Sequence, residues 1–555
     1  MSTHRTKTIV IVGGVAGGAS CATRLRRMDE EAEIIVFERG PYASFANCGL
    51  PYHIGGIIEN ESDLLVAKGP LFKERYGIDL RTRHEVVSID REAREVEIRD
   101  LDSDRIYRQA YDALVLSPGA APLRPPLPGI DLPGIFTVRN IPDARMIRSW
   151  IEQRSAKKAV IVGGGFIGLE MAENLRHLGL EVTLVEMLPQ VMPPMDVEMI
   201  SPVHDYLESK GIKLVLGAAV AGFAEQDGEL KVQVADGRYF NADLVILAIG
   251  VRPEASLAKE AGLTLGERGG IRVDEQMRTS DLNIWAVGDA VEVHDRITGA
   301  WTLLALAGPA NRQGRIAADA ICGRPVAFHG TQGTAVCGIF DLAVASTGAS
   351  EKALVRAGMQ DFEKLYLHAG SHAGYYPGAT RIHFKLIFRK TDGLILGAQA
   401  VGMDGVDKRI DVLAMAIQKG ASVHDLEEAE LCYAPQFGSA KDPINFAGMI
   451  AANHLRGDDP LLHWLDAGLK DFDLLDVRDE DEFAEGHVPG ALNIPLNSLR
   501  DSLSSLGRVR PLAVYCAVGG RAHNAVRLLR QKGFEACNVS GGYLSYRHVK
   551  GIQTL

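Results

Sequence analysis

One cysteine, Cys48, stands in a stretch that leaves its sulfur accessible for chemistry. It lies within Ser44–Tyr52, where small and amide side chains surround the thiol with hydrogen-bond donors. The thiolate is the reactive form of cysteine, and such surroundings can lower the thiol pKa from about 8.5. The alternative is a small buried hydrophobic residue, which is what a free cysteine usually is. Local chemistry leaves both interpretations of Cys48 open.

A second cysteine, Cys516, follows a buried strand-like run, Ala513–Tyr515, and precedes a turn that opens a helix. Such a strand–loop–helix points successive backbone N–H groups at one spot, with the helix dipole behind them. A sulfur at that spot is stabilised as an anion, either as a thiolate or as a persulfide. We therefore interpret Cys516 as a functional residue rather than a buried structural cysteine.

The elements that must position Cys48 occur twice in the chain. Each copy is an apolar strand, a glycine turn and a helix start, followed by a second strand that ends on an acid. The copies begin at Ile9 and Ala159, and their acids are Glu38 and Glu186. This is the dinucleotide-binding βαβ pattern, with the acid on a ribose hydroxyl. A lone fingerprint is a weak signal, whereas two with matching acids are a strong one.

The two copies differ in their glycines. The second has glycine at the three standard positions: Gly163, Gly165 and Gly168. In the first, Val15 takes the middle position, where glycine usually permits close approach of the pyrophosphate. Gly14 and Gly17 offer compensation, but the match is looser there.

Other buried strands end in turns that can face a ligand. The strand Ile284–Val287 ends in Gly288 and Asp289, and the strand that begins at Tyr111 ends in the turn Ser117–Gly119. A sibling of the Tyr111 strand, Ala242–Gly250, closes the second half. Ligands of α/β sheets bind at the carboxyl ends of the strands, so Asp289 is well placed to reach a cofactor. The alternative is a strand-end turn followed by a helix that Asp289 caps.

Length and composition favour a soluble, multidomain α/β protein. The chain has 555 residues, which is too long for one core, and 59 glycines. Its net charge of -11 gives no electrostatic case for binding nucleic acid or an anionic membrane. We find no signal peptide and no apolar run near the roughly 18 residues that span a bilayer. Seven scattered cysteines form neither a disulfide framework nor a zinc pattern, so we expect reduced thiols, no metal and a cytoplasmic location.

The pattern of apolar and polar residues changes after about residue 330. Alternating segments at Ile382–Phe388 and Gly393–Ala400 predict an antiparallel sheet, and Lys408–Gln418 predicts a helix. The region ends in a loop rich in helix breakers, Leu431–Pro443. A polar run, Arg456–Pro460, marks a boundary before a self-contained tail.

With these residues assembled, the first 450 or so residues resemble the flavin-dependent disulfide reductases. The nearest branch is coenzyme A disulfide reductase, with NADH oxidases and peroxidases as near relatives. Ser44–Cys48 is similar to the single-cysteine signature of that branch, whereas larger members carry Cys-x4-Cys. The tail resembles a rhodanese domain with Cys516–Arg521 as its active loop. The whole chain resembles the fused coenzyme A disulfide reductase–rhodanese proteins, also called NADH-dependent persulfide reductases.

The resemblance implies an α/β fold: two Rossmann-like dinucleotide-binding domains, an α+β dimerisation domain and a C-terminal α/β rhodanese domain. The implied boundaries are 1–151 and 271–328 for the FAD-binding domain, 152–270 for the NAD-binding domain, 329–452 for the dimerisation domain, 453–465 for a linker and 466–555 for the rhodanese domain.

It also implies FAD on the first fingerprint and NADH on the second. The fingerprint residues concerned are Gly13, Gly14, Val15, Ala16, Gly17, Gly18, Gly163, Gly165, Phe166, Ile167 and Gly168. The other implied cofactor contacts are Glu38, Arg39, Asn47, Ser117, Pro118, Gly119, Glu186, Gly250, Gly288, Asp289 and Pro309. A carboxylate at Glu186 would repel the extra phosphate of NADPH, so we expect NADH.

Coenzyme A contacts of the family map onto Ser20, Arg24, Arg27, Ser44, Asn47, Asn311 and Lys441. Arg24 and Arg27 lie about one helical turn apart, so one helix face can hold phosphates; without the resemblance, a solvated face is the simpler interpretation. One family lysine is replaced near Tyr76. The family is a homodimer in which a partner-subunit tyrosine faces the cysteine. Tyr433 matches that tyrosine, with Tyr375 or Tyr376 as a second.

The implied mechanism passes two electrons from NADH through FAD to Cys48, which attacks a disulfide or persulfide and forms a mixed disulfide. Tyr433 can donate a proton to the departing sulfur. Cys516, with Arg521 in its loop, takes up sulfane sulfur. The expected net reaction reduces small persulfides or polysulfides and releases hydrogen sulfide. Three alternatives stay open: a plain coenzyme A disulfide reductase, an NADH oxidase or peroxidase with a sulfenic acid at Cys48, and a non-catalytic sulfur carrier or redox sensor.

Overall fold

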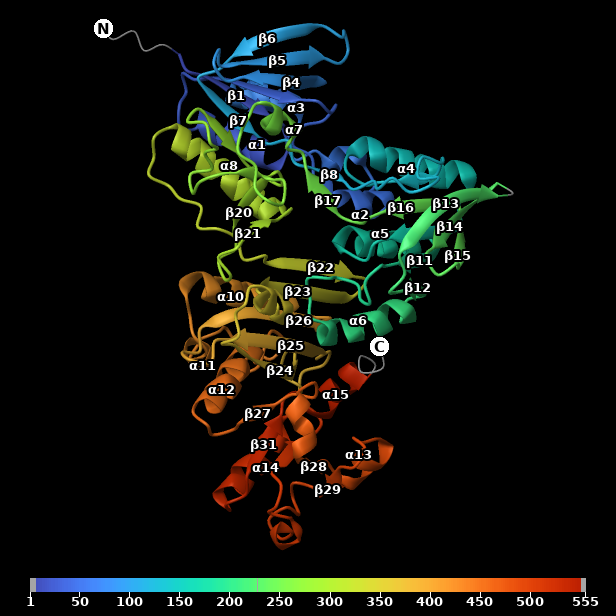
Figure 1. Cartoon of the computed structure of the whole chain (residues 1–555), viewed down its shortest axis with the longest axis vertical. Helices are drawn as coiled ribbons and strands as arrows, with labels where there is room; N and C mark the ends of the chain where they lie inside the picture. The colour runs from blue at the N-terminus through green and yellow to red at the C-terminus, as the bar shows by residue number, and fades with distance from the viewer. Residues whose placement is uncertain (1–5, 227, 551–555) are drawn as a thin grey trace. The chain divides into compact units, whose positions relative to one another are not determined.

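The computed structural model describes residues 6–226 and 228–550, which form two compact units. Unit 1 comprises Met1–Pro189 and Gly211–Thr331. Unit 2 comprises Gln190–Lys210 and Gln332–Leu555 (Figure 1). The chain therefore leaves unit 1 at Gln190, belongs to unit 2 as far as Lys210 and re-enters unit 1 at Gly211.

Unit 1 contains two parallel five-stranded sheets built in the same way. The first has the strand order β19-β7-β1-β2-β3, with β1 at Thr8–Val12, β2 at Glu33–Glu38, β3 at Asp79–Thr82, β7 at Ala113–Leu116 and β19 at Ile284–Ala286. Its central strand is apolar and buried, as a parallel strand covered on both faces must be. Helix α1 (Ala16–Arg26) follows β1 and packs on α8 (Ala307–Ile321).

The second sheet has the order β12-β11-β10-β16-β9. Its strands are β9 Ile135–Phe136, β10 Lys158–Val162, β11 Glu181–Val185, β12 Ile212–Val215 and β16 Leu244–Leu247, and helix α5 (Phe166–His177) follows β10. In both sheets the first strand, the helix and the second strand form a βαβ unit with parallel pairing. The two predicted Rossmann-like domains are confirmed.

Smaller elements complete unit 1. Two antiparallel sheets contain β4 His84–Asp90, β5 Glu95–Asp100 and β6 Ile106–Ala110, and β13 Val220–Gln226, β14 Glu229–Val234 and β15 Tyr239–Ala242. The remaining strands are β8 Ala120–Pro122, β17 Val251–Pro253, β18 Ile271–Arg272, β20 Val291–His294 and β21 Trp301–Leu303. The remaining helices are η1 Asn47–Gly49, α2 Leu50–Ile54, η2 Glu61–Leu64, α3 Gly69–Tyr76, α4 Ile141–Arg154 and α7 Ser256–Glu260.

Unit 2 begins with the antiparallel sheet that the alternating segments predict. Its order is β22-β23-β26-β25-β24, with β22 at Ala335–Ile339, β23 at Leu342–Gly348, β24 at Glu363–Gly370, β25 at Arg381–Phe388 and β26 at Ile395–Gly402 (Figure 1). Helices α6 (Val197–Ser209) and α10 (Val406–Lys419) pack on this sheet. The other helices are α9 Glu351–Arg356, α11 Val423–Glu427 and α12 Pro443–Leu455.

The tail folds as a parallel sheet of order β27-β31-β30-β28-β29. The strands are β27 Leu461–Leu462, β28 Asp473–Asp476, β29 Leu492–Asn493, β30 Leu512–Tyr515 and β31 Ala536–Val539. The helices are η3 Ala467–Asp471, α13 Glu480–Glu485, η4 Leu503–Ser505, α14 Gly520–Gln531 and α15 Gly542–Lys550. The predicted C-terminal α/β domain is confirmed. Among the helices of residues 6–226 and 228–550, none is long and apolar enough to cross a bilayer.

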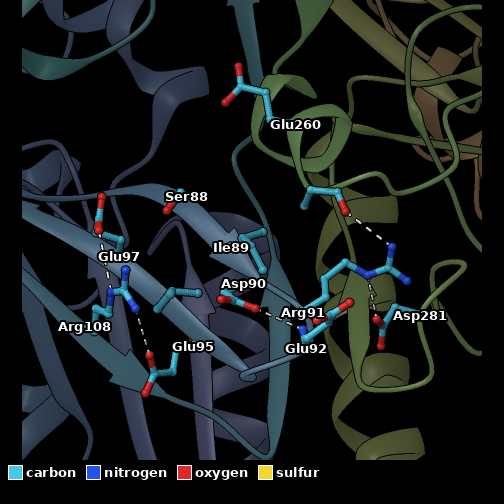
Figure 2. Close-up of a pocket in the computed structure, with 12 residues that line it drawn as sticks. Ser88, Ile89, Asp90, Arg91, Glu92, Glu95, Glu97, Arg108, Glu260 and Asp281 are labelled. Carbon is cyan, nitrogen blue, oxygen red and sulfur yellow. Dashed lines mark hydrogen bonds and ion pairs between the residues drawn. The ribbon is translucent and has the colours of Figure 1, made fainter.

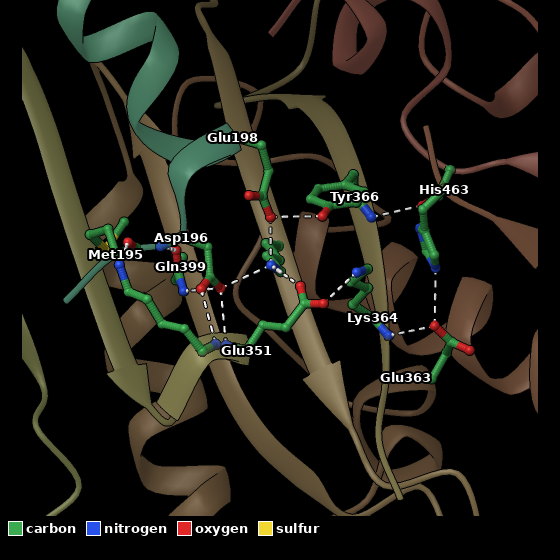
Figure 3. Close-up of polar contacts among 12 residues, drawn as sticks. Met195, Asp196, Glu198, Glu351, Glu363, Lys364, Tyr366, Gln399 and His463 are labelled. Carbon is green, nitrogen blue, oxygen red and sulfur yellow. Dashed lines mark hydrogen bonds and ion pairs between the residues drawn. The ribbon is translucent and has the colours of Figure 1, made fainter. Parts of the chain in front are cut away.

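A buried charge cluster fixes the segment Gln190–Lys210 to the antiparallel sheet (Figure 3). The Lys385 ammonium lies 2.8 Å from Asp196, 2.5 Å from Glu198 and 2.9 Å from Glu351. Burial opposes the charge, but the surrounding acids hold the pKa of Lys385 well above its ordinary value. The three carboxylates lie close enough together for a metal ion, yet the ammonium already bonds to all three of them. The cluster is therefore a structural ion network.

Candidate active site

The glycine turn of the first βαβ unit is required by close backbone packing. Gly13 has φ +95°, and a Cβ there would lie 2.1 Å from the Ser117 carbonyl oxygen. A Cβ on Gly18 would lie 1.9 Å from the Gly13 carbonyl oxygen. Only glycine permits these approaches, so the turn passes tightly between β1, β7 and α1.

The second unit repeats this geometry. Gly163 has φ +106°, and a Cβ there would lie 2.4 Å from the Ala248 carbonyl oxygen. A Cβ on Gly168 would lie 2.0 Å from the Gly163 carbonyl oxygen. Phe166 and Ile167 begin α5 at the same edge of the sheet, so its first N–H groups are directed at the turn.

The middle position explains why Val15 replaces glycine. Val15 and Gly165 cap their helices with φ values of -99° and -78°, which any residue can adopt. A Cβ on Gly165 would meet nothing within 4 Å. The backbone therefore does not require glycine at this middle position, where only the space needed by a ligand limits the side chain. Val15 fits the first unit without backbone strain.

The two acids hold their turns in the same way. Glu38 accepts hydrogen bonds from the N–H groups of Gly14 at 2.8 Å and Gly40 at 2.7 Å. Glu186 accepts them from Gly164 at 2.6 Å and Leu188 at 2.8 Å. Each carboxylate therefore lies beside its glycine turn, where the ribose of a bound dinucleotide lies in such folds.

A cavity of about 310 Å³ opens at the carboxyl edge of the first sheet. It brings together most of the residues expected at the first cofactor: Gly13, Val15, Ala16, Gly17, Glu38, Arg39, Asn47, Ser117, Pro118, Gly119, Gly288 and Asp289. Gly14, Gly18 and Pro309 do not line it, although Ala310 does. Gly250 lies between β16 and β17, with φ +106°. The cavity fits FAD, because the glycine turn, the ribose-side acid Glu38 and the half-buried carboxyl of Asp289 line the same space.

Sequence reasoning missed Arg139 and Glu254, two charged side chains of this cavity. Glu254 accepts hydrogen bonds from Arg139 at 2.7 Å and from Arg39 at 2.6 Å. Burial opposes ionisation, but the two guanidinium groups hold the pKa of Glu254 below its ordinary value. Arg139 also faces Asp289, whose pKa burial raises. No local motif marks Arg139 or Glu254, because the two residues meet only in the folded chain.

Cys48 lies in η1 and is exposed in the single chain. The expectation that its neighbours lower its pKa is wrong. Desolvation by the surrounding protein raises the pKa of the Cys48 thiol, and the charges of Glu170 and Asp289 raise it further. Burial also raises the pKa of Glu170, to about 7. The side-chain amide oxygen of Asn47, Oδ1, lies 4.0 Å from the sulfur; it is a hydrogen-bond acceptor and so does not stabilise a thiolate.

Some of the residues that the resemblance assigns to coenzyme A come together in unit 1. The Ser20 hydroxyl donates to the Asn311 carbonyl oxygen at 3.1 Å, which joins α1 to α8. Arg27 is exposed, whereas Arg24 is paired with Asp319 at 2.7 Å. Ser44, with φ +48°, is held by a hydrogen bond from its N–H to Gly14 at 2.8 Å.

The candidate tyrosines are adjacent and exposed on unit 2. The hydroxyl oxygens of Tyr375 and Tyr433 lie 2.6 Å apart, and this hydrogen bond raises the pKa of Tyr375. Tyr376, Phe437 and Lys441 are exposed as well. A monomer of ordinary composition rarely presents several exposed aromatic residues together, so this surface is suited to contact with another protein.

Cys516 directly follows β30 and is buried at the start of its loop. Gly519, with φ +107°, turns its N–H toward the sulfur at 3.2 Å before α14 begins. One backbone N–H, that of Gly519, therefore points at the sulfur just before α14, as one part of the arrangement that the sequence predicts. Arg521 is not free: it pairs with Glu482 at 2.6 Å and with Asp479 at 3.2 Å.

A larger cavity, of about 690 Å³, lies elsewhere in unit 1 between β4, β5 and α7 (Figure 2). Most of its charged groups are acidic, and Arg108 lies 3.7 Å from both Glu95 and Glu97. Arg91 is paired with Asp281 at 2.8 Å. This acidic lining repels phosphates and so disfavours a dinucleotide in this cavity.

Two dinucleotide cradles beside one exposed cysteine define an oxidoreductase that works on sulfur, and comparison identifies the family. Residues 7–314 match the pyridine nucleotide-disulphide oxidoreductases, and residues 334–442 match their dimerisation domain. Residues 461–548 match the rhodanese-like domain. The chain belongs to the pyridine nucleotide-disulphide oxidoreductase family, which uses FAD and NADH, and it carries a rhodanese domain at its end.

Three similar proteins narrow the relationship. A coenzyme A disulfide reductase of Staphylococcus haemolyticus is 36% identical over 443 residues, which cover 80% of this chain and 98% of that protein. The crystal structure of reduced CoADR-RHD of Bacillus anthracis is 47% identical and covers 98% of both chains, with a TM-score of 0.96. The structure of a NAD-dependent persulfide reductase from A. fulgidus is 37% identical and covers 97% of this chain and all of that one, with a TM-score of 0.91. The chain is thus similar to flavin- and NADH-dependent sulfur reductases.

Proposed function

We propose that this enzyme reduces persulfides and polysulfides with NADH and releases hydrogen sulfide. Its substrates would be coenzyme A persulfide or related small persulfides, and also coenzyme A disulfide. The observation that carries the proposal is the presence in one chain of two different sulfur sites. Cys48 is exposed next to Asn47, which lines the first cofactor cavity, and Cys516 lies in an anion-stabilising loop.

The cofactors would occupy the two βαβ units, with Glu38 and Asp289 toward FAD and Glu186 toward NADH. When bound, FAD supplies two-electron transfer between the nicotinamide and sulfur. The chain contributes orientation through its glycine turns, and charge through Arg39, Arg139 and Glu254.

Cys48 would act as the nucleophile. Its thiolate attacks the inner sulfur of coenzyme A persulfide; the sulfur–sulfur bond of the substrate breaks, a mixed disulfide forms and HS⁻ leaves. Two electrons and one proton then convert the mixed disulfide into the Cys48 thiolate and free coenzyme A. With coenzyme A disulfide, the first step releases coenzyme A in place of sulfide.

The proton for the departing sulfur would come from the tyrosine pair Tyr375–Tyr433 of a second copy of the chain. The hydrogen bond between the two hydroxyls and their exposure support this role. The match to a dimerisation domain and the exposed aromatic surface support a homodimer. Ser20, Arg27, Ser44, Asn47 and Asn311 of unit 1 would bind coenzyme A.

Cys516 would accept sulfane sulfur from a donor and pass it on, directly or through coenzyme A. In this role Gly519 donates its N–H to the sulfur.

The test is anaerobic oxidation of NADH by the purified protein with coenzyme A persulfide, coenzyme A disulfide or hydrogen peroxide as acceptor, with sulfide measured directly. We expect the highest kcat/KM with the persulfide and one sulfide released per NADH. Cys48→Ser should abolish turnover of both sulfur substrates while FAD stays bound. A higher kcat/KM for the disulfide would instead define a coenzyme A disulfide reductase. A preference for peroxide would define a peroxidase, faster NADH oxidation in a parallel aerobic assay without another acceptor would define an oxidase, and no multiple turnover at all would leave a sulfur carrier or sensor.

A further inference from the structure

A cavity of about 530 Å³ in unit 2 adjoins the rhodanese active loop. Ala517 and Val518, the two residues that follow Cys516, line one side. Tyr543 and Leu544 of α15 line another, and their N–H groups donate to the carbonyl oxygens of Cys516 at 2.8 Å and Ala517 at 3.0 Å. The cavity wall and the cysteine loop are therefore parts of one hydrogen-bonded structure.

Three arginines line this cavity: Arg381, Arg478 and Arg547. Arg478 has a structural role, because it is buried and pairs with Asp476 at 2.7 Å. Arg381 and Arg547 are exposed, and neither forms an ion pair with a carboxylate in the described part of the chain. Two cations thus face the cavity with their charge available to a ligand.

The acids of the cavity do not cancel this charge. Glu482 is engaged by Arg521 at 2.6 Å, and the only other acid among the lining residues is the exposed Glu485. The same pairing neutralises the cation of the active loop itself, since Arg521 also bonds to Asp479. An anionic donor approaching Cys516 therefore meets uncompensated positive charge only at Arg381 and Arg547 among the lining residues.

We propose that this cavity is an anion subsite that holds the charged remainder of the sulfur donor while its sulfane sulfur reaches Cys516. The ligand class is a small donor with a sulfonate, carboxylate or phosphate group. Arg381 lies at the start of β25 in the dimerisation sheet, and Arg547 lies in α15 of the rhodanese domain. Two domains of unit 2 thus contribute to one subsite, and donor selection by the rhodanese domain depends on its neighbour.

The inference rests on the proposed role of Cys516. With thiosulfate, the Cys516 thiolate attacks the outer sulfur, the sulfur–sulfur bond breaks and sulfite leaves with the bonding electron pair. The products are a Cys516 persulfide anion and sulfite, so charge and atoms balance without an added oxidant. Thiosulfate carries two negative charges, whereas 2-hydroxyethyl persulfide has an uncharged remainder and is the matched neutral donor.

The experiment measures single-turnover persulfidation of Cys516 by mass spectrometry of its peptide, in the full-length protein carrying Cys48→Ser. We compare Arg381→Gln/Arg547→Gln with the unchanged protein and with Arg500→Gln. Arg500 is an exposed residue of the rhodanese domain that does not line the cavity. Loss of two partly solvated cations should lower the second-order rate constant for thiosulfate about tenfold, which corresponds to roughly 1.4 kcal/mol.

The same variant should keep the rate with 2-hydroxyethyl persulfide, which also shows that the domain is folded. Arg500→Gln should change neither rate, and Arg381→Gln alone should lower the thiosulfate rate selectively. Equal losses with both donors, or no loss with thiosulfate, would overturn the subsite while leaving the role of Cys516 intact. A Cys516 that neither donor modifies in the unchanged protein would overturn that role and the subsite with it.

Discussion

Arg24 and Asp319 form a bidentate ion pair, with Nε 2.7 Å from Oδ1 and Nη2 3.2 Å from Oδ2. The pair joins α1 to α8, and both side chains are largely buried. The hydrogen bond to Asp319 raises the pKa of Arg24. Of the two arginines that the resemblance assigns to coenzyme A phosphates, one is thus committed to the fold, and Arg27 remains available.

Arg27→Ala should therefore raise the KM for coenzyme A disulfide several-fold with little change in kcat or in melting temperature. Arg24→Ala should instead lower the melting temperature, because it leaves the Asp319 carboxylate buried without its partner. Steady-state kinetics and thermal unfolding of both variants separate these roles. If Arg24→Ala changed only the KM, the ion pair would be part of the substrate site.

Glu186→Arg should shift the preference from NADH toward NADPH. The arginine removes a repulsive carboxylate and can pair with the extra phosphate, so we expect roughly a tenfold change in the ratio of kcat/KM values, or about 1.4 kcal/mol. Some activity should be lost with both cofactors, because Gly164 and Leu188 lose their acceptor. Glu181→Arg, an exposed charge change on β11, is the control. An unchanged ratio would show that Glu186 does not contact the ribose.

Cys516→Ala should abolish sulfurtransferase activity and leave most NADH-dependent reduction of small persulfides. A small persulfide needs no carrier, since its attack depends on access to Cys48 and on the thiolate fraction. Both activities are measured on the same preparation. A parallel collapse of the two would make Cys516 an obligatory relay to Cys48.

Acid should destabilise unit 2 through a histidine cluster between the dimerisation sheet and α15. His383 Nδ1 lies 2.9 Å from His368 Nδ1, and the rings of His383 and His548 are 4.8 Å apart. Burial lowers the pKa of His383 to about 4 and, with the charges of His383 and Arg547, that of His548 to about 3. Burial and the neighbouring His383, His548 and Arg381 also lower the pKa of His368.

Because the unfolded chain takes up protons near pH 6.5 and the folded cluster does not, stability is present above that pH. It is lost as the pH falls from about 6.5 toward the pKa values of the folded cluster. Thermal unfolding from pH 7.5 to 5 should show this loss, and His548→Asn should flatten it. His424→Gln, which changes an exposed histidine, should leave the slope as it is. A slope that His548→Asn does not alter would exclude the cluster as its source.

Lys385→Met should destabilise unit 2 strongly, since it leaves Asp196 and Glu198 without their buried cation and leaves Glu351 with Lys364 alone. Removing one partner of a buried ion network costs roughly 3–5 kcal/mol. Lys390→Met, which changes an exposed lysine 3.8 Å from Glu363, should cost far less. Denaturant unfolding measures both. Similar midpoints for the two variants would contradict a central role for the network.

The parts of the fold that the sequence predicts are those determined by local sterics. The glycine turns at Gly13 and Gly163 can be predicted because a Cβ at either position would clash with a backbone carbonyl oxygen. The alternation in β25 and β26 is readable because successive side chains face opposite sides of a sheet. Cys516 is readable because its strand, loop and helix are contiguous in the chain.

The parts that escape prediction depend on residues far apart in the sequence. The pKa of Cys48 was expected to fall from its immediate neighbours, but Glu170 and Asp289, from α5 and from the end of β19, help to raise it. Arg139 and Glu254 meet at the cofactor cavity without any shared motif. The alternation of residues in its strand predicts that Lys385 faces solvent. It is instead fully buried, and it pairs with Asp196 from a segment far away in the sequence.

Because Gln190–Lys210 belongs to unit 2, the order of the segments along the chain limits how the protein can be cut into domains and how its gene can recombine. A fragment that starts at residue 332 lacks α6, and with it Asp196 and Glu198, so Lys385 would keep only Glu351. The dimerisation module is therefore not a cassette that a single crossover can transfer. The rhodanese module, which lies wholly after α12, can be gained or lost by one event at its border. Recombination that follows this architecture would exchange the rhodanese domain and keep all residues before it together.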